Sequence, residues 1–191
     1  MRYSVSLAAI TVVCWLGACS QSHDPTYHKT DLSGVYLSTE ALDPNKSVIV
    51  SVSRDGIYHN NYYAGSGREV ALKTAAAFSR FARKVEVAGA ELQGREELLR
   101  AARGANAGYL IIPSIVHWEP RVTEWALIPA QVDVSLSVIN VETGHEIRAT
   151  LLEARSSKSA TATSSLDSMY SGLLDDHVAE LYGARAPISQ R

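Results

Sequence analysis

The chain has 191 residues, of which 46% are hydrophobic and 20% are charged, and its formal net charge is −2. This balance is typical of a single globular domain, and the slight negative charge argues against a nucleic-acid-binding protein or a basic membrane-binding surface. Beyond the N-terminal segment, no apolar stretch is long enough to cross a bilayer as a helix.

The first 18 residues have the organisation of a bacterial signal peptide. A short start with one arginine precedes an uncharged apolar run over residues 4–16, which is too short to span a bilayer. The run ends in four residues that resemble the lipobox of bacterial lipoproteins: Leu16, Gly17, Ala18 and Cys19. We therefore expect cleavage before Cys19 and acylation of its thiol. The alternative is an ordinary secretory signal that ends near a cysteine.

The residues after the cut bear on location. Cys14 lies in the removed segment, so acylation of Cys19 leaves the mature chain without a thiol for a disulfide. Ser20 follows Cys19, and by resemblance to the sorting rules of bacteria with two membranes, the absence of Asp there favours the outer membrane over inner-membrane retention. The composition predicts a flexible tether over residues 19–46, a globular domain over 47–183 on the periplasmic side, and a frayed tail over 184–191.

The first half of the domain alternates strands and helices. The β-branched segment 47–53 predicts a strand. Ser66 and Glu69 fit a capping box at the start of a helix whose apolar residues recur at helical spacing as far as Phe81. Residues 84–88 predict a short strand and residues 95–105 a second helix.

The second half predicts three strands and a closing helix. The apolar segment 109–116 is typical of a central strand, although Pro113 argues against that because proline cannot donate to a ladder. Segment 132–138 alternates apolar and polar residues, segment 146–154 completes a hairpin, and segment 166–181 is a helix. The predicted fold is therefore α/β or α+β, with a mixed sheet of about five strands packed with three helices in one domain.

The loop before the first helix has two features of interest. The Gly65-Ser66-Gly67 sequence fits helix capping better than phosphate binding, because the Walker spacing and its lysine are missing. Tyr58, Tyr62 and Tyr63 precede it and form either a lid on the core or part of an interface.

Three motifs carry a resemblance to a known family: the lipobox, the loop from Tyr63 to Gly67, and the run from His117 to Trp125. Together they resemble the DUF4823 family of bacterial lipoproteins of unknown function. The strand–helix order also resembles the N-terminal domain of TolB, the curli-secretion lipoprotein and the lipoprotein activators of peptidoglycan synthases. The resemblance implies a lipoprotein class and brings no catalytic residues.

The candidate functional surface concentrates aromatic and charged residues within nine positions: His117, Trp118, Glu119, Arg121, Glu124 and Trp125. The two tryptophans could present an aromatic platform to a partner protein or to a small ligand such as a glycan. Alternatively, they cover one end of the core. Alternation along a strand would place His117 and Glu119 on one face and Trp118 on the other.

The sequence holds no recognisable catalytic motif, so we expect a non-enzymatic protein without cofactor or metal. Two functions remain open. The first is an outer-membrane lipoprotein that docks an envelope protein partner through the Trp118–Trp125 segment or a sheet edge. The second is a binding module for a small envelope ligand.

Overall fold

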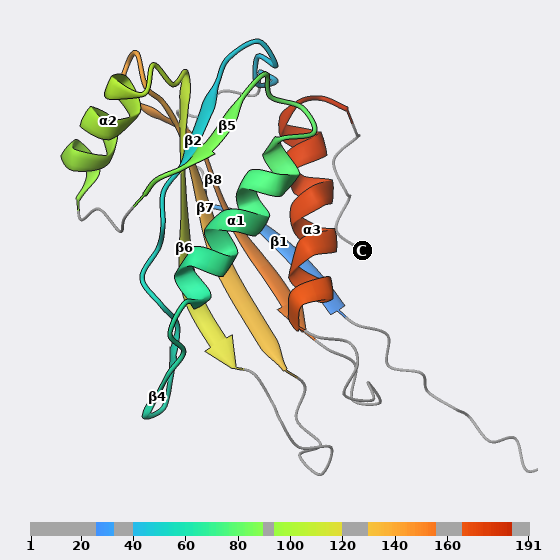
Figure 1. The fold of residues 1–191 in the computed structure, drawn as a ribbon. Helices are drawn as coiled ribbons and strands as arrows, with labels where there is room; N and C mark the ends of the chain where they lie inside the picture. Colours follow the sequence, from blue (N-terminus) through green and yellow to red (C-terminus); the bar gives the residue numbers. More distant parts are fainter. Residues whose placement is uncertain (1–25, 33–39, 90–93, 120–129, 156–165, 185–191) are drawn as a thin grey trace, which may run out of the picture.

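The computed structural model describes residues 26–32, 40–89, 94–119, 130–155 and 166–184 (Figure 1). A six-stranded mixed sheet runs through the domain in the order β1-β8-β7-β6-β2-β5, and a separate two-stranded sheet joins β3 (Ile57–Tyr58) to β4 (Asn61–Tyr62). The strands of the large sheet are β1 (Thr26–Asp31), β2 (Val48–Val50), β5 (Val85–Val87), β6 (Tyr109–Glu119), β7 (Gln131–Asn140) and β8 (Glu146–Arg155). This confirms the predicted mixed sheet with three helices in one domain. Of the two predicted classes the fold is α+β, and the sheet has six strands rather than about five.

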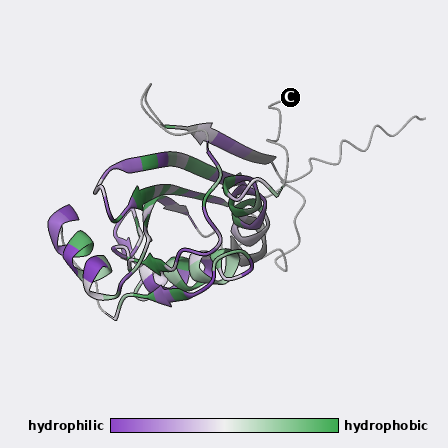
Figure 2. Ribbon diagram, turned by 90° about the horizontal axis from the view of Figure 1, so that it is seen from above, coloured by the Kyte–Doolittle hydropathy of each residue, from purple (hydrophilic) through white to green (hydrophobic). Residues whose placement is uncertain are grey.

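The two faces of the sheet carry different helices. Helices α1 (Ser66–Phe78) and α3 (Leu166–Leu181) cover one face, and α2 (Arg95–Gly104) lies on the other (Figure 1). The alternation of strand side chains explains this arrangement, since Val48 and Val50 point into the larger core beneath α1 and α3, whereas Ile49 joins the smaller cluster under α2. Figure 2 shows hydrophilic residues alongside hydrophobic ones on α2, as expected for a helix with only one buried side.

The strand predicted to be central, β6, changes its role along its length. Residues Tyr109 to Ile111 pair with β2 on one side and with β7 on the other. Ser51 then donates its N–H to the carbonyl of Ile111 at 2.9 Å, and the alternation of a parallel ladder assigns the next donor to Pro113. Because proline has no N–H, the β2–β6 ladder ends there, and the rest of β6 pairs with β7 alone.

The structure differs from the predicted tether at residues 26–31 and 42. Thr26–Asp31 forms the edge strand β1, antiparallel to β8 with Thr26 opposite Arg155. Leu42 is buried in the larger core at 5% exposure. Strand pairing with an existing sheet orders a segment that has too few apolar residues to fold by itself. Among the described residues, no helix is long and apolar enough to cross a membrane.

Candidate functional site

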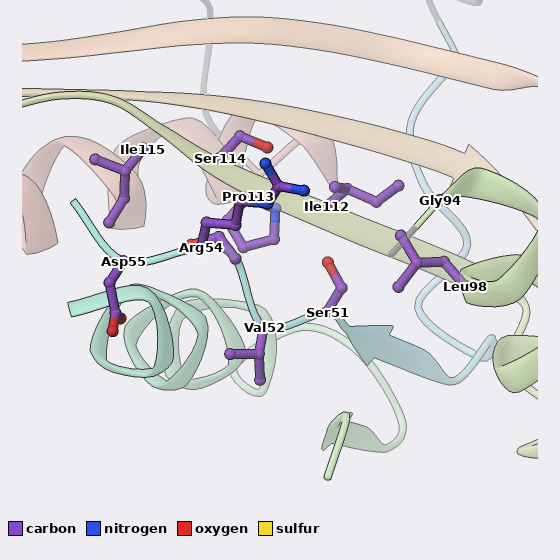
Figure 3. Close-up of a pocket in the computed structure, with 11 residues that line it drawn as sticks. Ser51, Val52, Arg54, Asp55, Gly94, Leu98, Ile112, Pro113, Ser114 and Ile115 are labelled. Carbon is purple, nitrogen blue, oxygen red and sulfur yellow. The ribbon is translucent and has the colours of Figure 1, made fainter. Parts of the chain in front are cut away.

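A cleft of about 300 Å³ opens where β2 and β6 separate, on the face of the sheet that carries α2 (Figure 3). Its polar lining includes Ser51, Arg54 and Ser114, and its apolar lining includes Leu98 and Ile112. The cleft lies at the carboxyl end of β2, where the loss of the Pro113 donor lets the two strands diverge. Carboxyl ends of parallel strands are frequent ligand sites in open sheets.

Asp55 closes one end of this cleft and holds the start of α1. Its Oδ1 accepts the N–H of Gly67 at 2.8 Å, and its Oδ2 accepts the N–H of Gly65 at 3.0 Å and the hydroxyl of Tyr62 at 2.6 Å. These hydrogen bonds stabilise the charged carboxylate, and the one from Tyr62 has the largest effect. They lower the pKa of Asp55 below its usual 3.8, although partial desolvation acts in the opposite direction.

The predicted capping box is therefore wrong. The helix N-cap is Gly65, in a left-handed conformation with φ of 88°, and no side chain of the cap residue bonds the helix. Ser66 Oγ instead accepts the N–H of Gly56 and donates to the carbonyl of Tyr63, both at 2.8 Å. Glu69 forms an ion pair with Lys73 one turn later. Asp55 satisfies the helix N–H groups from outside the helix, a non-local cap that the short sequence pattern does not reveal.

A second polar cluster lies at the end of β6. The hydroxyl of Tyr58 donates to Oε1 of Glu119 at 2.6 Å, and Nε2 of His117 lies 3.0 Å from Oε2 of the same carboxylate. The rings of Tyr58 and His117 meet edge to face with centroids 5.9 Å apart. Glu119 is buried at 7% exposure. His117 and Glu119 thus share a face as the alternation predicted, and both carboxylate oxygens have partners within the domain.

Trp118 points to the opposite side and packs against the larger core. A Cβ atom added at Gly56 would lie 2.7 Å from Cβ of Trp118, so the glycine is needed for this close approach. The structure therefore places Trp118 as a cover on the core, whereas Arg121, Glu124 and Trp125 lie outside the described residues. The aromatic platform formed by both tryptophans stays a prediction.

Three large apolar side chains are exposed at this same end of the domain. Strands β3 (Ile57–Tyr58) and β4 (Asn61–Tyr62) form a hairpin in which Ile57 pairs with Tyr62, and each is 65% exposed. Val116 is 61% exposed on β6, where the register with β7 shifts. The tyrosine cluster of the sequence predicts a lid or an interface in this region. The exposure of Ile57 and Val116 had no sequence signal, because Ile57 is an isolated apolar residue and Val116 ends a segment whose pattern predicts burial.

The polar side chains at this end of the domain already have hydrogen-bond partners within the domain. The polar side chains of the Glu119 cluster bond one another, and Asp55 is used to hold the start of α1. Within the described ranges, no group of three or more His, Cys, Asp or Glu side chains is placed to hold a metal ion.

Comparison with known proteins identifies the family. Residues 40–174 match the model described as "Domain of unknown function (DUF4823)". The chain belongs to the DUF4823 family. The match begins after β1 and includes β2 to β8 and the first part of α3, so it covers both the cleft and the Glu119 cluster. No curated protein gives a significant sequence match.

Several solved structures have a fold similar to that of this chain. The PelC dodecamer from Paraburkholderia phytofirmans is similar with a TM-score of 0.61 at 19% identity, covering 85% of this chain and 99% of that chain. A point variant of the same dodecamer, solved in another space group, gives a TM-score of 0.59 at 18% identity, covering 84% and 99%. The LpoB C-terminal domain from Escherichia coli has a TM-score of 0.42 at 14% identity, covering 60% and 85%, and at that score the similarity says nothing further about this chain.

Proposed function

We propose that this DUF4823 protein is a non-enzymatic lipoprotein of the bacterial outer membrane, acylated at Cys19, and that its periplasmic domain docks other protein chains. We propose further copies of the same chain as its first partner. The lipobox supports the anchor. The observation that carries the docking role is the likeness of the whole domain to PelC, whose solved structure is described as a dodecamer.

The two edges of the sheet are the surfaces we propose for self-association. β1 and β5 lie at opposite ends of the strand order, and in the described part of the chain neither pairs with a further strand. An edge strand presents unpaired backbone N–H and C=O groups, to which another chain can add. Contact between two different edges is head-to-tail, and repetition of such a contact gives a ring where the rotation closes and an open filament where it does not.

In-cell photo-crosslinking of the lipid-anchored protein tests this proposal. The photoreactive residue replaces His28 on β1 or Glu86 on β5, both exposed, and replaces exposed Arg100 on α2 as the control. We expect adducts between copies from positions 28 and 86, with each edge mapped onto the other by mass spectrometry. Adducts with one other envelope protein would support the docking role but identify that protein, rather than a second copy of the chain, as the partner. Labelling of neither edge above the level at position 100 would refute docking through the edges.

A small-ligand binding module is the second candidate, and the cleft at the carboxyl end of β2 favours it. Its lining combines hydroxyl groups and a guanidinium with apolar side chains, a mixture suited to a saccharide. Isothermal titration with soluble peptidoglycan fragments and with oligosaccharides tests it. Binding that is lost when Ser114→Trp fills the cleft would support this candidate, and no heat with any of these ligands would remove it.

A further inference from the structure

The strand register shows which end of the domain lies near the proposed lipid anchor. Thr26 lies opposite Arg155, Arg155 opposite Gln131, and Gln131 opposite Glu119, so these four residues mark one end of the sheet. Only six residues separate Cys19 from Thr26. Even fully extended, that connection reaches about 24 Å.

The opposite end of the sheet is much farther from the anchor. β7 and β8 have ten residues each and turn at Glu142 and Thr143, which places that turn about 30 Å beyond Thr26 at the usual rise per strand residue. A chain that is acylated at Cys19 therefore keeps the Thr26 end close to the leaflet. The turn end can reach the leaflet only if the domain lies on its side.

The hairpin β3–β4 projects at the Thr26 end, beyond the ends of β6 and β7 (Figure 1). It is held to the domain by the Tyr58–Glu119 and Tyr62–Asp55 hydrogen bonds. Its base is closed by the N–H of Tyr63, which donates to the carbonyl of Gly56 at 3.0 Å. The side chains of Ile57 and Tyr62 are mostly exposed on it. These contacts tie the hairpin to β6 and to the loop before it while its apolar side chains stay exposed.

The composition of the hairpin suits the boundary between lipid headgroups and acyl chains. Residues 57–63 (IYHNNYY) include no Lys, Arg, Asp or Glu, so their insertion removes no fixed charge from water. Tyrosine has an apolar ring and a polar hydroxyl, and it is enriched at membrane interfaces for that reason. Val116 adds an exposed apolar side chain on β6 at the same end.

We propose that the β3–β4 hairpin and Val116 form a membrane-contact surface, with Ile57 and Tyr62 at the headgroup boundary of the leaflet that holds the Cys19 lipid. This inference rests on the proposed lipid anchor. The contact sets the domain upright on the membrane, with the sheet edges β1 and β5 facing sideways, where they are accessible to neighbouring copies.

The test places a fluorophore at single introduced cysteines in the acylated full-length protein. Cleavage removes Cys14 and acylation blocks Cys19, so each introduced thiol is the only one available. Nitrobenzoxadiazole is attached at position 57 or, as a second site, at 116. The controls are position 142, at the far turn, and position 72, exposed on α1. The proteins are reconstituted in vesicles of phosphatidylethanolamine and phosphatidylglycerol, with and without doxyl-labelled lipid.

We expect a blue-shifted emission at positions 57 and 116 and its loss to doxyl-lipid quenching, with neither change at 142 or 72. A blue shift without quenching means that a protein surface covers the hairpin, and quenching at 72 alone means that the domain lies on its side. Either result overturns the inference. If the protein floats with the vesicles but the emission at 57 and 116 does not change, the inference is overturned and the lipid anchor is retained. A chain that lacks the acyl mass and does not float refutes the anchor itself, and with it the inference.

Discussion

Gly67→Ala tests the packing of the start of α1 against the loop that leads into the hairpin. A Cβ atom at this position would lie 2.1 Å from the carbonyl oxygen of Ser53 and 3.0 Å from the carbonyl carbon of Arg54. Both neighbours are backbone atoms, so no side-chain rotation relieves the overlap, and the helix and the loop must separate by at least about 1 Å to reach ordinary contact. The separation also weakens the hydrogen bond from the Gly67 N–H to Asp55.

The expected loss of stability follows from these two effects. Overpacking costs about 1–3 kcal/mol, and the weakened bond to a charged, half-buried acceptor adds about 1–2 kcal/mol. The free energy of unfolding should therefore fall by about 2–5 kcal/mol, a large part of the ~5–15 kcal/mol typical of a domain. At a urea m-value of about 1–3 kcal/mol/M, the unfolding midpoint should fall by on the order of 1–2 M.

Two other glycines provide matched controls in the same urea titration, followed by far-ultraviolet circular dichroism. Gly65→Ala meets no atom within 4 Å, but its φ of 88° costs an L-residue about 1–2 kcal/mol. Gly104→Ala lies at the end of α2 in open space and should be neutral or stabilising by up to about 1 kcal/mol. If Gly67→Ala unfolds at the same urea concentration as Gly104→Ala, the close approach of α1 to the 53–55 loop is refuted.

Three further predictions concern the candidate site. Folding lowers the pKa of Asp55, so its carboxylate stabilises the fold above pH ~4, and this contribution disappears as the pH falls through the folded pKa. Asp55→Asn lacks this carboxylate. In urea titrations it should therefore lose less stability than the wild type between pH 7 and pH 3. Glu119→Ala removes the acceptor of the Tyr58 hydroxyl, and hydrogen exchange at the amides of the hairpin should become faster while α3 amides stay protected. Trp118→Ala should lower the free energy of unfolding by about 2–4 kcal/mol because Trp118 packs on the core, whereas Trp125→Ala should leave thermal stability nearly unchanged if that residue serves binding.

The elements with strong periodicity were predictable from the sequence. The central strand, the β7–β8 hairpin and the three helices have long apolar patterns. Each pattern requires a buried face, and it does so whichever neighbouring element covers that face. Pro113 conflicts with a strand that is paired on both sides, as its missing N–H predicts. The resolution of this conflict, a strand that is central for three residues and then loses one neighbour, depends on where β2 ends and is not encoded in the local pattern of β6.

The remaining elements depend on contacts between distant segments. The β1 segment TYHKTD has no apolar density, and it is a strand because β8 offers a free edge. Asp55 caps α1 from ten or more residues earlier, so a rule that searches for the cap beside the helix selects Ser66 instead. The role of Trp118 depends on Gly56, and no periodicity relates those two positions.

Native mass spectrometry of the full-length protein, extracted from the outer membrane in mild detergent, tests the proposed function most directly. We expect a chain that begins at Cys19, carries the mass of the acyl groups, and is released as a discrete assembly of several copies. Recovery of an unacylated chain that stays a monomer at all concentrations would contradict it.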